Sequence, residues 1–323
     1  MEIVRSLRAF EAPAGGAAVA VGNFDGLHRG HRKILRTLLR ESNRRGLPSY
    51  ILTFSPHPEK YFSPSKILML QTLEQRLESL AGLKPDGTII ALFRRSFAEL
   101  TAREFARDIL AASLGARLVV VGADFRFGRG RQGDLALLDR LGPPLGFDVV
   151  GVPPLRRKGE VVSSSRIRAL LAAGEVERAN DLLGRPFEIE GDVVPGEGRG
   201  RRLGFPTANL ETPNEIAPAG VFLTELRRGG AALPSITNIG LRPTFGRPHW
   251  TVEAHVLDFS DDLCGASVRL AFLGKLRDER AFAGAEALAA QIRRDIAAAR
   301  RFFGIGRSGA KNLPARGRLD SYG

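Results

Sequence analysis

The chain has 323 residues, 43% of them hydrophobic and 26% charged, with a net charge of +13 at pH 7. This composition is typical of a folded globular protein, and the length is enough for two ordinary domains. No apolar run approaches the roughly 20 residues that cross a bilayer. The first ten residues lack the apolar centre of a signal peptide, and a single cysteine excludes an internal disulfide and a cysteine-cluster metal site. We therefore expect a cytoplasmic protein with no membrane partner.

The positive charge has three interpretations. It can serve a nucleic-acid partner, it can attract polyanionic nucleotide substrates, or it can reflect an arginine-rich composition without functional meaning. The arginines are spread along the chain, and only three tyrosines and one tryptophan are available to stack on bases. We expect no nucleic-acid partner.

Strands and helices alternate in the first half of the chain. The apolar run at 17–21 predicts a strand, and the helix after it has Ile34, Leu35, Leu38 and Leu39 on one face. This alternation predicts an α/β domain with a Rossmann-like parallel sheet and helices on both faces. Further strands are expected at 50–54, 88–93, 117–121, 147–152 and near Val161, and a helix at 101–112.

The pattern changes after Leu183. Short strands separated by Gly and Pro turns predict a small antiparallel β-barrel, closed by a helix at 285–303 that is rich in Ala and Arg. We expect one domain at 1–183, a second at 184–303, and a flexible basic tail at 304–323. The strands of the second domain are expected at 188–194, 221–226, 235–239, 251–259 and 267–273.

The segment 22–31, Gly-Asn-Phe-Asp-Gly-Leu-His-Arg-Gly-His, joins the first strand to the first long helix. Loops at this edge of a parallel sheet bind ligands, and its glycines let the backbone approach one closely. His28 and His31 share one face of the first helical turn, and Asp25 is a candidate helix cap. The N–H groups and the dipole of a helix N-terminus favour anions, to which imidazoles add directional hydrogen bonds. The segment predicts a phosphate site.

Two other interpretations of the histidine pair are a metal site and surface residues without function. No cysteine and no clear third ligand accompany the pair, although a metal site usually needs more ligands. Two of the five histidines in the chain fall within four residues at a strand-to-helix junction, which makes chance a weak explanation.

Two later segments fit the same site. The segment 122–128 follows a predicted strand, and 163–168 begins a helix with serine caps and two arginines that suit a triphosphate. A plain helix cap with solvated arginines is the other interpretation of 163–168. Three glycines from Gly128 to Gly133 match the spacing of a dinucleotide motif, but they lie too far beyond the strand for its tight turn, and we reject that motif.

A second distinctive segment, 199–210, is a basic glycine-rich loop followed by Pro-Thr-Ala-Asn-Leu. Thr207 and Asn209 point to one face of an extended strand, and their oxygens suit Mg²⁺ beside ATP phosphates. A turn-rich barrel corner is the alternative. Glu253 and His255 share one face of a later strand. A carboxylate there can accept a proton from a substrate hydroxyl, or it can simply be solvated.

The first motifs resemble those of a known family. His28-x-x-His31 after Gly-Asn-Phe-Asp-Gly is similar to the signature of the HxGH nucleotidyltransferase superfamily. With Gly-x-Asp-Phe-Arg-Phe-Gly at 122–128 and Ser-Ser-Ser-Arg-Ile-Arg at 163–168, it resembles the adenylyltransferase half of bacterial bifunctional riboflavin kinase/FAD synthetases. Ser165 stands where that family usually has threonine, and both residues offer a hydroxyl.

The later motifs resemble the flavokinase half of the same family. They are Pro-Thr-Ala-Asn at 206–209, Asn-Ile-Gly at 238–240 with Arg-Pro-Thr-Phe at 242–245, and Glu253-x-His before Leu-Asp-Phe. Two positions depart from the family pattern, Phe222 in place of tyrosine and Cys264 in place of the tyrosine of Asp-Leu-Tyr-Gly.

The resemblance implies two enzyme activities, a riboflavin kinase and an FMN adenylyltransferase. ATP would phosphorylate riboflavin to FMN, and a second ATP would adenylylate FMN to FAD with release of pyrophosphate. Mg²⁺ would accompany ATP, and a homo-oligomer is a possible state of the protein. The resemblance gives catalytic roles to Glu253, as the base for the ribityl 5′-hydroxyl, and to His28 and His31. It further implies ATP binding in the adenylyltransferase by Gly22, Asn23, Phe24, Asp25, Asp124, Ser164, Ser165 and Arg168; ATP binding in the kinase by Gly200, Gly204, Pro206, Thr207 and Asn209, of which Thr207 and Asn209 also hold the metal; and flavin binding by Arg277 and Glu279.

Two rival functions follow from the same residues. Another nucleotidyltransferase of the superfamily, acting on a pantetheine or glycerol phosphate, would have no need of the Pro-Thr-Ala-Asn barrel. A nucleic-acid-binding protein would show binding with a steep salt dependence and no ATP turnover.

Overall fold

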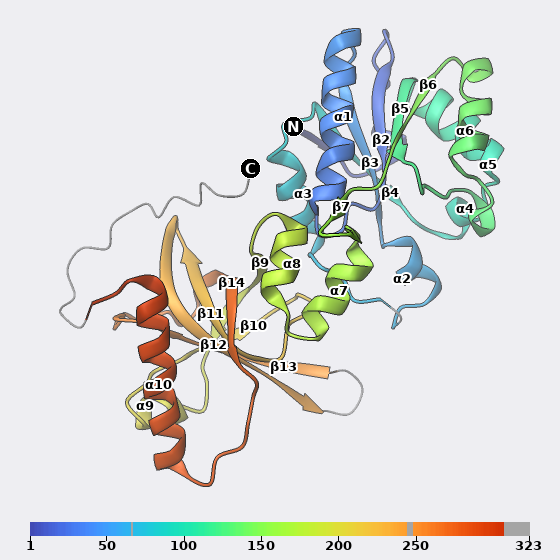
Figure 1. The fold of residues 1–323 in the computed structure, drawn as a ribbon. Coiled ribbons are helices and arrows are strands. Elements are labelled where there is room, and N and C mark those ends of the chain that lie inside the picture. The colour runs from blue at the N-terminus through green and yellow to red at the C-terminus, as the bar shows by residue number, and fades with distance from the viewer. Residues whose placement is uncertain (66, 244–247, 307–323) are drawn as a thin grey trace. The chain divides into compact units, whose positions relative to one another are not determined.

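The computed structural model describes residues 1–65, 67–243 and 248–306. The chain forms two compact units, and the first ends at Arg166 (Figure 1). Within the described ranges no helix is both long and apolar enough to span a membrane. The expected tail from residue 307 on lies outside these ranges, as do Thr244 and Phe245 of the predicted flavokinase motif.

The first unit is built on a parallel sheet with the strand order β1-β4-β3-β2-β5-β6. Every neighbouring pair in it is parallel, as the alternating pattern of the sequence predicted. The α/β fold of this half is thereby confirmed. The strands are β1 (Glu2–Val4), β2 (Ala17–Val21), β3 (Ser49–Ser55), β4 (Gly87–Leu92), β5 (Ala116–Gly122) and β6 (Asp148–Val152).

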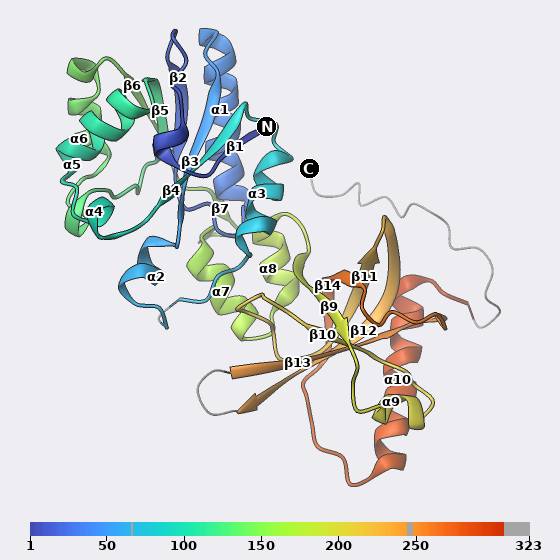
Figure 2. The ribbon, with the colours of Figure 1, turned by 180° about the vertical axis from the view of Figure 1, so that it is seen from behind.

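Helices cover both faces of this sheet because its central strands alternate their side chains between two hydrophobic cores. Ala18 and Ala20 of β2 pack with Leu35 and Leu38 of α1, whereas Val19 packs on the opposite face with α6. Figure 2 shows α1 and α3 on one side of the sheet and α5 and α6 on the other. The helices of this unit are α1 (Arg29–Arg45), α2 (Pro58–Phe62), α3 (Leu73–Ala81), α4 (Arg95–Ala98), α5 (Ala102–Glu104) with a π-helical continuation at Phe105–Ser113, and α6 (Leu135–Leu141). Helix α7 (Ser164–Ala172) begins at the end of this unit and continues into the second.

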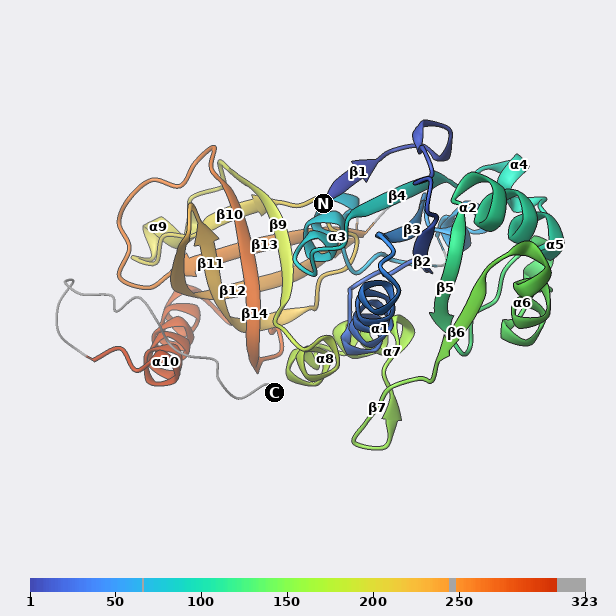
Figure 3. The same ribbon diagram turned by 90° about the horizontal axis from the view of Figure 1, so that it is seen from above.

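The second unit contains a closed antiparallel barrel with the strand order β10-β13-β12-β11-β14-β9 (Figure 3). This confirms the barrel that the short, turn-separated strands predicted. Its strands are β9 (Phe187–Val194), β10 (Ala208–Glu211), β11 (Gly220–Arg228), β12 (Ala231–Pro243), β13 (Pro248–Val256) and β14 (Ser267–Arg277), and its helices are α8 (Val176–Leu183), α9 (Arg199–Arg202) and α10 (Ala285–Phe303).

Apolar side chains fill the barrel interior, and α10 packs on the outside. Phe222 and Phe272 meet edge to face inside, with ring centroids 5.5 Å apart. Ala299 of α10 joins an outer cluster with Val221 and Ile236. The expected helix at 285–303 therefore closes the barrel from outside, and the interior is a packed core.

The end of the first unit lies ahead of the domain boundary expected near Gly184. Helix α8 packs against the barrel, since Asn180 donates to the carbonyl of Phe272 at 2.8 Å and accepts from the N–H of Phe187 at 2.7 Å. The strand expected near Val161 is not part of the parallel sheet. It pairs in a separate hairpin, β7 (Arg156–Arg157) with β8 (Glu160–Val161), because the short connection allows only an antiparallel return.

Candidate active sites

The loops after β2 and β5 meet where the strand order of the parallel sheet changes direction. From β2 the chain passes to β3 on one side, and β5 lies on the other. Such a switch point opens a crevice at the carboxyl ends of the strands. Gly22, Asn23 and Asp124 line one cavity of about 820 Å³ at this edge. The structure thus brings together, in one cavity, two of the three segments that were predicted to share a site, 22–31 and 122–128.

His28 caps the first helix of the sheet domain. Its Nδ1 accepts a hydrogen bond from the backbone N–H of His31 at 3.2 Å, and the two rings stack with centroids 3.6 Å apart. Because Nδ1 is the acceptor, the proton of the neutral His28 ring resides on Nε2, which is then a donor. The pair therefore combines a helix N-terminus with an imidazole N–H.

The prediction that Asp25 caps this helix is wrong. Its carboxylate accepts from the backbone N–H groups of Leu70, at 3.1 Å, and Gln71, at 3.2 Å. The backbone between Asp25 and the cap turns through positive φ at Gly26 (83°) and Leu27 (37°), so the carboxylate is directed away from the helix. Asp25 is buried, and its carboxylate attaches the loop to the segment just before α3.

Gly22 and Gly30 lie so close to neighbouring rings of this loop that a side chain at either position would crowd them. A Cβ on Gly22 would lie 2.9 Å from the ring of Phe24, whose φ is 52°. A Cβ on Gly30 would lie 3.1 Å from the His28 ring. Phe24 is 1% exposed and packs in the core, and it is not among the residues that line the 820 Å³ cavity.

The serine and arginine segment ties the start of α7 to the same loop. Ser164 Oγ donates to the carbonyl of Asp25 at 2.9 Å. Arg166 forms a bidentate salt bridge with Glu160 of the β7–β8 hairpin, in which Nε and Nη2 each donate to a carboxylate oxygen at 2.9 Å. Its guanidinium is therefore already engaged. Ser165 is exposed, and Arg168 follows on α7 in the second compact unit.

Aromatic side chains line much of the rest of the 820 Å³ cavity, and none of those beyond the loops at 22–31 and 122–128 was predicted from the sequence. They come from the end of β3 and from the segments that follow β3, β4 and β5, so no local pattern brings them together. The sequence gives one hint of such a cavity, which is its composition of nineteen phenylalanines beside three tyrosines and one tryptophan. The cavity suits a flat aromatic ligand, with arginines beside it for a charged group. Its aromatic lining is Phe54, Tyr61, Phe62, Phe93, Phe97, Phe105, Phe125 and Phe127, and its arginines are Arg95, Arg126, Arg129 and Arg131.

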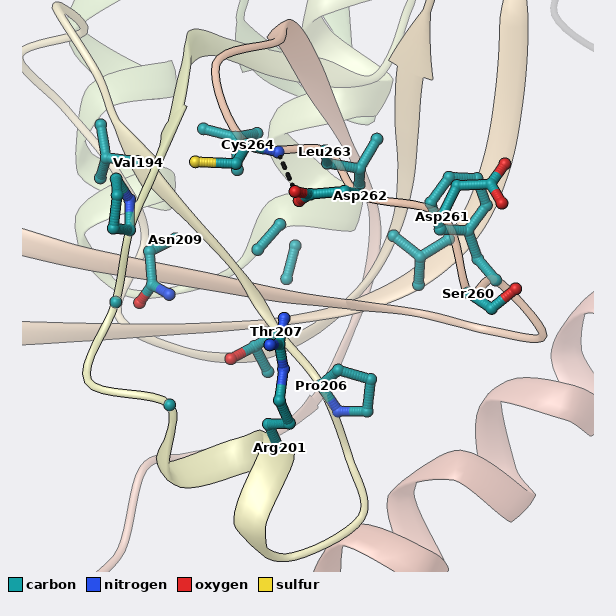
Figure 4. A pocket seen from close by; sticks show the side chains of 18 residues that line it. Val194, Arg201, Pro206, Thr207, Asn209, Ser260, Asp261, Asp262, Leu263 and Cys264 are labelled. Atoms are coloured by element: carbon teal, nitrogen blue, oxygen red, sulfur yellow. Dashed lines mark hydrogen bonds between the residues drawn. The ribbon is translucent and has the colours of Figure 1, made fainter.

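Two cavities of the barrel unit meet at the Pro-Thr-Ala-Asn segment. One has about 680 Å³ and the other about 560 Å³, and Thr207 and Asn209 line both. Figure 4 shows Thr207, Asn209 and Arg201 beside the first cavity, with the loop from Ser260 to Cys264 across from them. Glu253 lines the second cavity. A group transferred from a ligand in one cavity to a ligand in the other would pass Thr207 and Asn209.

Three polar side chains form a row across neighbouring strands at this junction. Glu253 of β13 is paired in register with Asn209 of β10 on one side and with Asn238 of β12 on the other. Directly paired residues have Cβ atoms about 4.5–5.5 Å apart. Val252 and Ala254 point inward and are buried, so this row lies on the outer face of the barrel. Asn238 lines the second cavity but was not among the predicted site residues.

Close packing fixes the loop before β10. A Cβ on Gly200 would lie 2.4 Å from the Phe205 carbonyl oxygen, and one on Gly196 would lie 2.0 Å from Asn209 Nδ2. His255 adds a hydrogen bond between Nδ1 and the carbonyl of Pro206 at 2.8 Å. Because a carbonyl only accepts, Nδ1 of His255 carries the proton.

The basic part of this loop folds into α9, and Gly204 turns the chain after it with a φ of 84°. Arg199 pairs with Glu197 at 2.6 Å, and Arg202 donates to the Glu197 carbonyl. Arg201 lines the first cavity, whereas Arg199 lines the second.

Both predicted flavin residues line the second cavity. Arg277 bonds to Asp295 of α10 through Nε at 3.0 Å and Nη2 at 2.8 Å, and its guanidinium carbon is 5.7 Å from the centre of the Phe282 ring. A Cβ on Gly240 would lie 2.8 Å from a Glu279 carboxylate oxygen.

The two departures from the family pattern lie outside the second cavity. Phe222 is fully buried in the barrel interior, where its ring meets that of Phe272, and it does not line the second cavity. Cys264 is exposed and lines the first cavity instead.

The oxygen ligands at the junction fit a magnesium ion carried by ATP. Thr207 offers a hydroxyl and Asn209 an amide oxygen, and Mg²⁺ usually takes few protein ligands and keeps waters and phosphate oxygens. In the ranges that the structure describes, no group of three His, Cys, Asp or Glu side chains is arranged to hold a metal ion.

Comparisons with known proteins match both halves of the chain. A family model described as FAD synthetase matches residues 11–166, and one described as riboflavin kinase matches residues 183–303. The chain is 40% identical to the bifunctional riboflavin kinase/FMN adenylyltransferase of Escherichia coli (strain K12), over 94% of this chain and 99% of that protein. It is 38% identical to the protein of the same name from Pseudomonas fluorescens, over 93% and 97%.

A solved structure shares the fold of both halves. It is named a macrolide-efflux protein from Streptococcus pneumoniae, and it aligns with a TM-score of 0.84 at 27% identity, over 92% of this chain and 98% of that one. The sequence matches extend over both halves and agree with the geometry of both sites. The chain belongs to the family of bifunctional riboflavin kinase/FMN adenylyltransferases.

Proposed function

We infer that this chain converts riboflavin to FMN and FMN to FAD, using one ATP in each step. The observation that carries the kinase assignment is the meeting of two cavities at Thr207 and Asn209, with Glu253 beside the junction. The adenylyltransferase assignment depends on the histidine pair at a helix N-terminus beside the sheet's ligand edge. Membership in the bifunctional family joins the two reactions in one chain.

In the kinase step, riboflavin occupies the 560 Å³ cavity and ATP the 680 Å³ cavity. Glu253 accepts the proton of the ribityl 5′-hydroxyl, whose oxygen bonds to the γ-phosphorus as the bond to the β-phosphate oxygen breaks. Thr207 and Asn209 would hold Mg²⁺, which neutralises phosphate charge when it is bound. Arg277, fixed by Asp295, orients the flavin end of the substrate.

In the adenylyl step, the flavin ring of FMN occupies the aromatic cavity beside Gly22 and Asn23. A phosphate oxygen of FMN attacks the α-phosphorus of ATP, and pyrophosphate leaves, so no protein nucleophile is needed. The Nε2–H of His28, the His31 side chain and the backbone N–H groups of the helix N-terminus stabilise the charge that develops on the phosphate.

The experiment that tests this assignment separates the two steps in one protein. Purified chain is incubated with Mg-ATP and either riboflavin or FMN, and FMN and FAD are separated by chromatography. Loss of the general base in Glu253→Ala should slow FMN formation by about 10²–10⁴-fold and leave conversion of supplied FMN to FAD unchanged. Loss of both steps in this variant would overturn the two-site assignment.

The reciprocal variant changes the other site. The double substitution His28→Ala with His31→Ala should make FMN accumulate from riboflavin, because only the second step loses its charge stabilisation. Undiminished FAD output by this variant would refute the role of the two histidines. Each variant's remaining activity serves as its control for correct folding.

The same proposal includes the protein's location, domain boundary, partners and substrates. We place the protein in the cytoplasm, where ATP for both steps is available, and we keep Gly184 as the functional boundary between the domains. Neither reaction needs a nucleic-acid or membrane partner. The substrates are riboflavin, FMN and ATP.

A further inference from the structure

A buried arginine on α3 contacts the loop that carries the first site. Arg76 is 4% exposed. Its Nη1 donates to the carbonyl of Asn23 at 2.9 Å, and its Nη2 donates to the carbonyl of Phe54 at 2.9 Å. The Asn23 carbonyl lies in the loop after β2, the Phe54 carbonyl lies one residue before the end of β3, and both residues line the aromatic cavity. One guanidinium therefore fixes two neighbouring strand ends at the ligand edge of the sheet.

The Asn23 carbonyl receives a second hydrogen bond, from Thr53 Oγ1 at 3.1 Å. A carbonyl oxygen has two lone pairs, so these two donors use its full capacity. The backbone at this point is consequently held in one orientation.

The segment around α3 holds the same loop from a second point. Two residues beyond Asn23, the Asp25 carboxylate accepts the N–H groups of Leu70 and Gln71, which precede α3. The loop is thus held at two points. The Asn23 carbonyl is bound by the cation of Arg76 on α3, and the Asp25 carboxylate is bound by backbone N–H groups just before α3. Between these clamps the chain adopts the positive φ of Phe24, which needs external support.

The charge of Arg76 is costly at this depth. Burial lowers the pKa of its guanidinium, and the negative charge of Asp25 acts in the opposite direction. Arginine nevertheless stays protonated in proteins, so a buried cation must be offset by good hydrogen bonds. An apolar residue would be the simpler solution for a helix that only packs on a sheet, which points to a need for the forked donor at this place.

We propose that Arg76 is a positioning residue for adenylyl transfer, which orients the loop from Gly22 to His28 by fixing the Asn23 carbonyl. This inference depends on the proposed adenylyltransferase function. The residue acts through the loop backbone, and its effect is expected on turnover more than on binding of the flavin ring, which the aromatic side chains provide.

The test compares three variants of the full chain. Arg76→Met keeps much of the apolar stem and removes both hydrogen bonds, and Arg76→Lys keeps the charge with a single flexible donor group. Leu80→Ala is the matched control, because Leu80 is buried on the same helix and packs in the core without a polar group. For each variant we would measure four quantities: kcat for FAD formation, the Kd of FMN from flavin fluorescence, the Tm, and the riboflavin kinase rate.

Arg76→Met should lower kcat for FAD formation by at least about tenfold, because a loop displaced by an ångström can cost more than that. The Kd of FMN should change less than about threefold, the kinase rate should stay unchanged, and Arg76→Lys should recover part of the loss. Leu80→Ala should lower the Tm with a smaller effect on kcat, measured well below its Tm.

Equal kcat losses in Arg76→Met and Leu80→Ala at matched Tm would overturn the proposal, as would a lysine variant no better than methionine. If Arg76→Met does not fold, Arg76→Lys decides: a kcat loss with an unchanged kinase rate supports the proposal, and an unchanged kcat refutes it. Failure of the unmodified chain to make FAD would instead refute the proposed function.

Discussion

Gly196 offers the sharpest perturbation of the kinase site. Its backbone does not require glycine through a positive φ, so an alanine is tolerated by the chain itself. A Cβ at this position, however, would lie 2.0 Å from Asn209 Nδ2 and 2.5 Å from its Cγ. Gly196→Ala therefore acts on one side chain, the amide that we assign to Mg-ATP.

The size of the effect follows from the displacement. Moving the Asn209 amide from 2.0 Å to an ordinary contact distance of 3.4 Å requires a shift of about 1.4 Å. A misplacement of about 1 Å in a catalytic group costs on the order of 100-fold in rate, or about 2.7 kcal/mol. We expect kcat/KM of the kinase for ATP to fall by about that factor, with no change in the conversion of FMN to FAD.

The assay measures FMN formation against ATP and Mg²⁺ concentration, with Gly198→Ala as the control. Gly198 has a φ of 70° and open space around its Cβ position, so alanine there adds about 1 kcal/mol of backbone strain to the same loop without touching Asn209. If Gly198→Ala impairs the kinase as much as Gly196→Ala, the contact with Asn209 is not the cause. In an Asn209→Ala background, Gly196→Ala should cost little more, because the side chain that it displaces is gone.

Three further outcomes follow from the structure. His255→Phe keeps a ring beside the loop but loses the bond to the Pro206 carbonyl, so the kinase KM for Mg-ATP should rise about fivefold, as expected for one hydrogen bond; an unchanged KM in steady-state kinetics would count against this role. Asp295→Asn leaves Arg277 without its carboxylate partner and should raise the KM for riboflavin by about tenfold, with adenylyl transfer as the unaffected control. The pKa of Asp86 lies below its ordinary value of 3.8 because a backbone N–H at the start of β3 donates to it, so the stability that it contributes is present above that pH and is lost as the pH falls through the folded pKa. Asp86→Asn should therefore lower the urea midpoint at neutral pH, and a deficit that persists unchanged in acid would contradict this account.

The main features of the fold could be predicted because long elements carry a clear period. The buried face of α1 shows the helical period, and the strands β2 and β5 were predicted from continuous apolar runs instead. A strand of three residues, such as β1, is too short to show a period of two. Helix α3 was missed although its Thr72–Gln75 capping box is visible in the sequence.

The candidate site residues could be predicted where one loop carries several of them. The histidine pair and the Thr207/Asn209 segment are of this kind, since a strand or a helix turn brings residues two or three apart to one face. The direction of Asp25 could not be predicted, because it depends on positive φ at Leu27, a residue that rarely adopts it. The aromatic cavity could not be predicted either, because separate loops meet only when the sheet is assembled.

A common rule separates what the sequence showed from what it did not. Groups assigned to substrate lie within short motifs, whereas the groups that hold those motifs come from far along the chain. Arg76 is 53 positions from the carbonyl of Asn23, and His255 is 49 positions from the carbonyl of Pro206. A loop with several glycines cannot hold its own conformation against entropy, so a rigid helix or strand must supply the fixed partner. In both sites that partner binds a backbone carbonyl, which any amino acid at the held position provides. No motif in the loop can therefore reveal its anchor, and the anchors are where substitutions should reduce turnover without removing a group that touches the substrate.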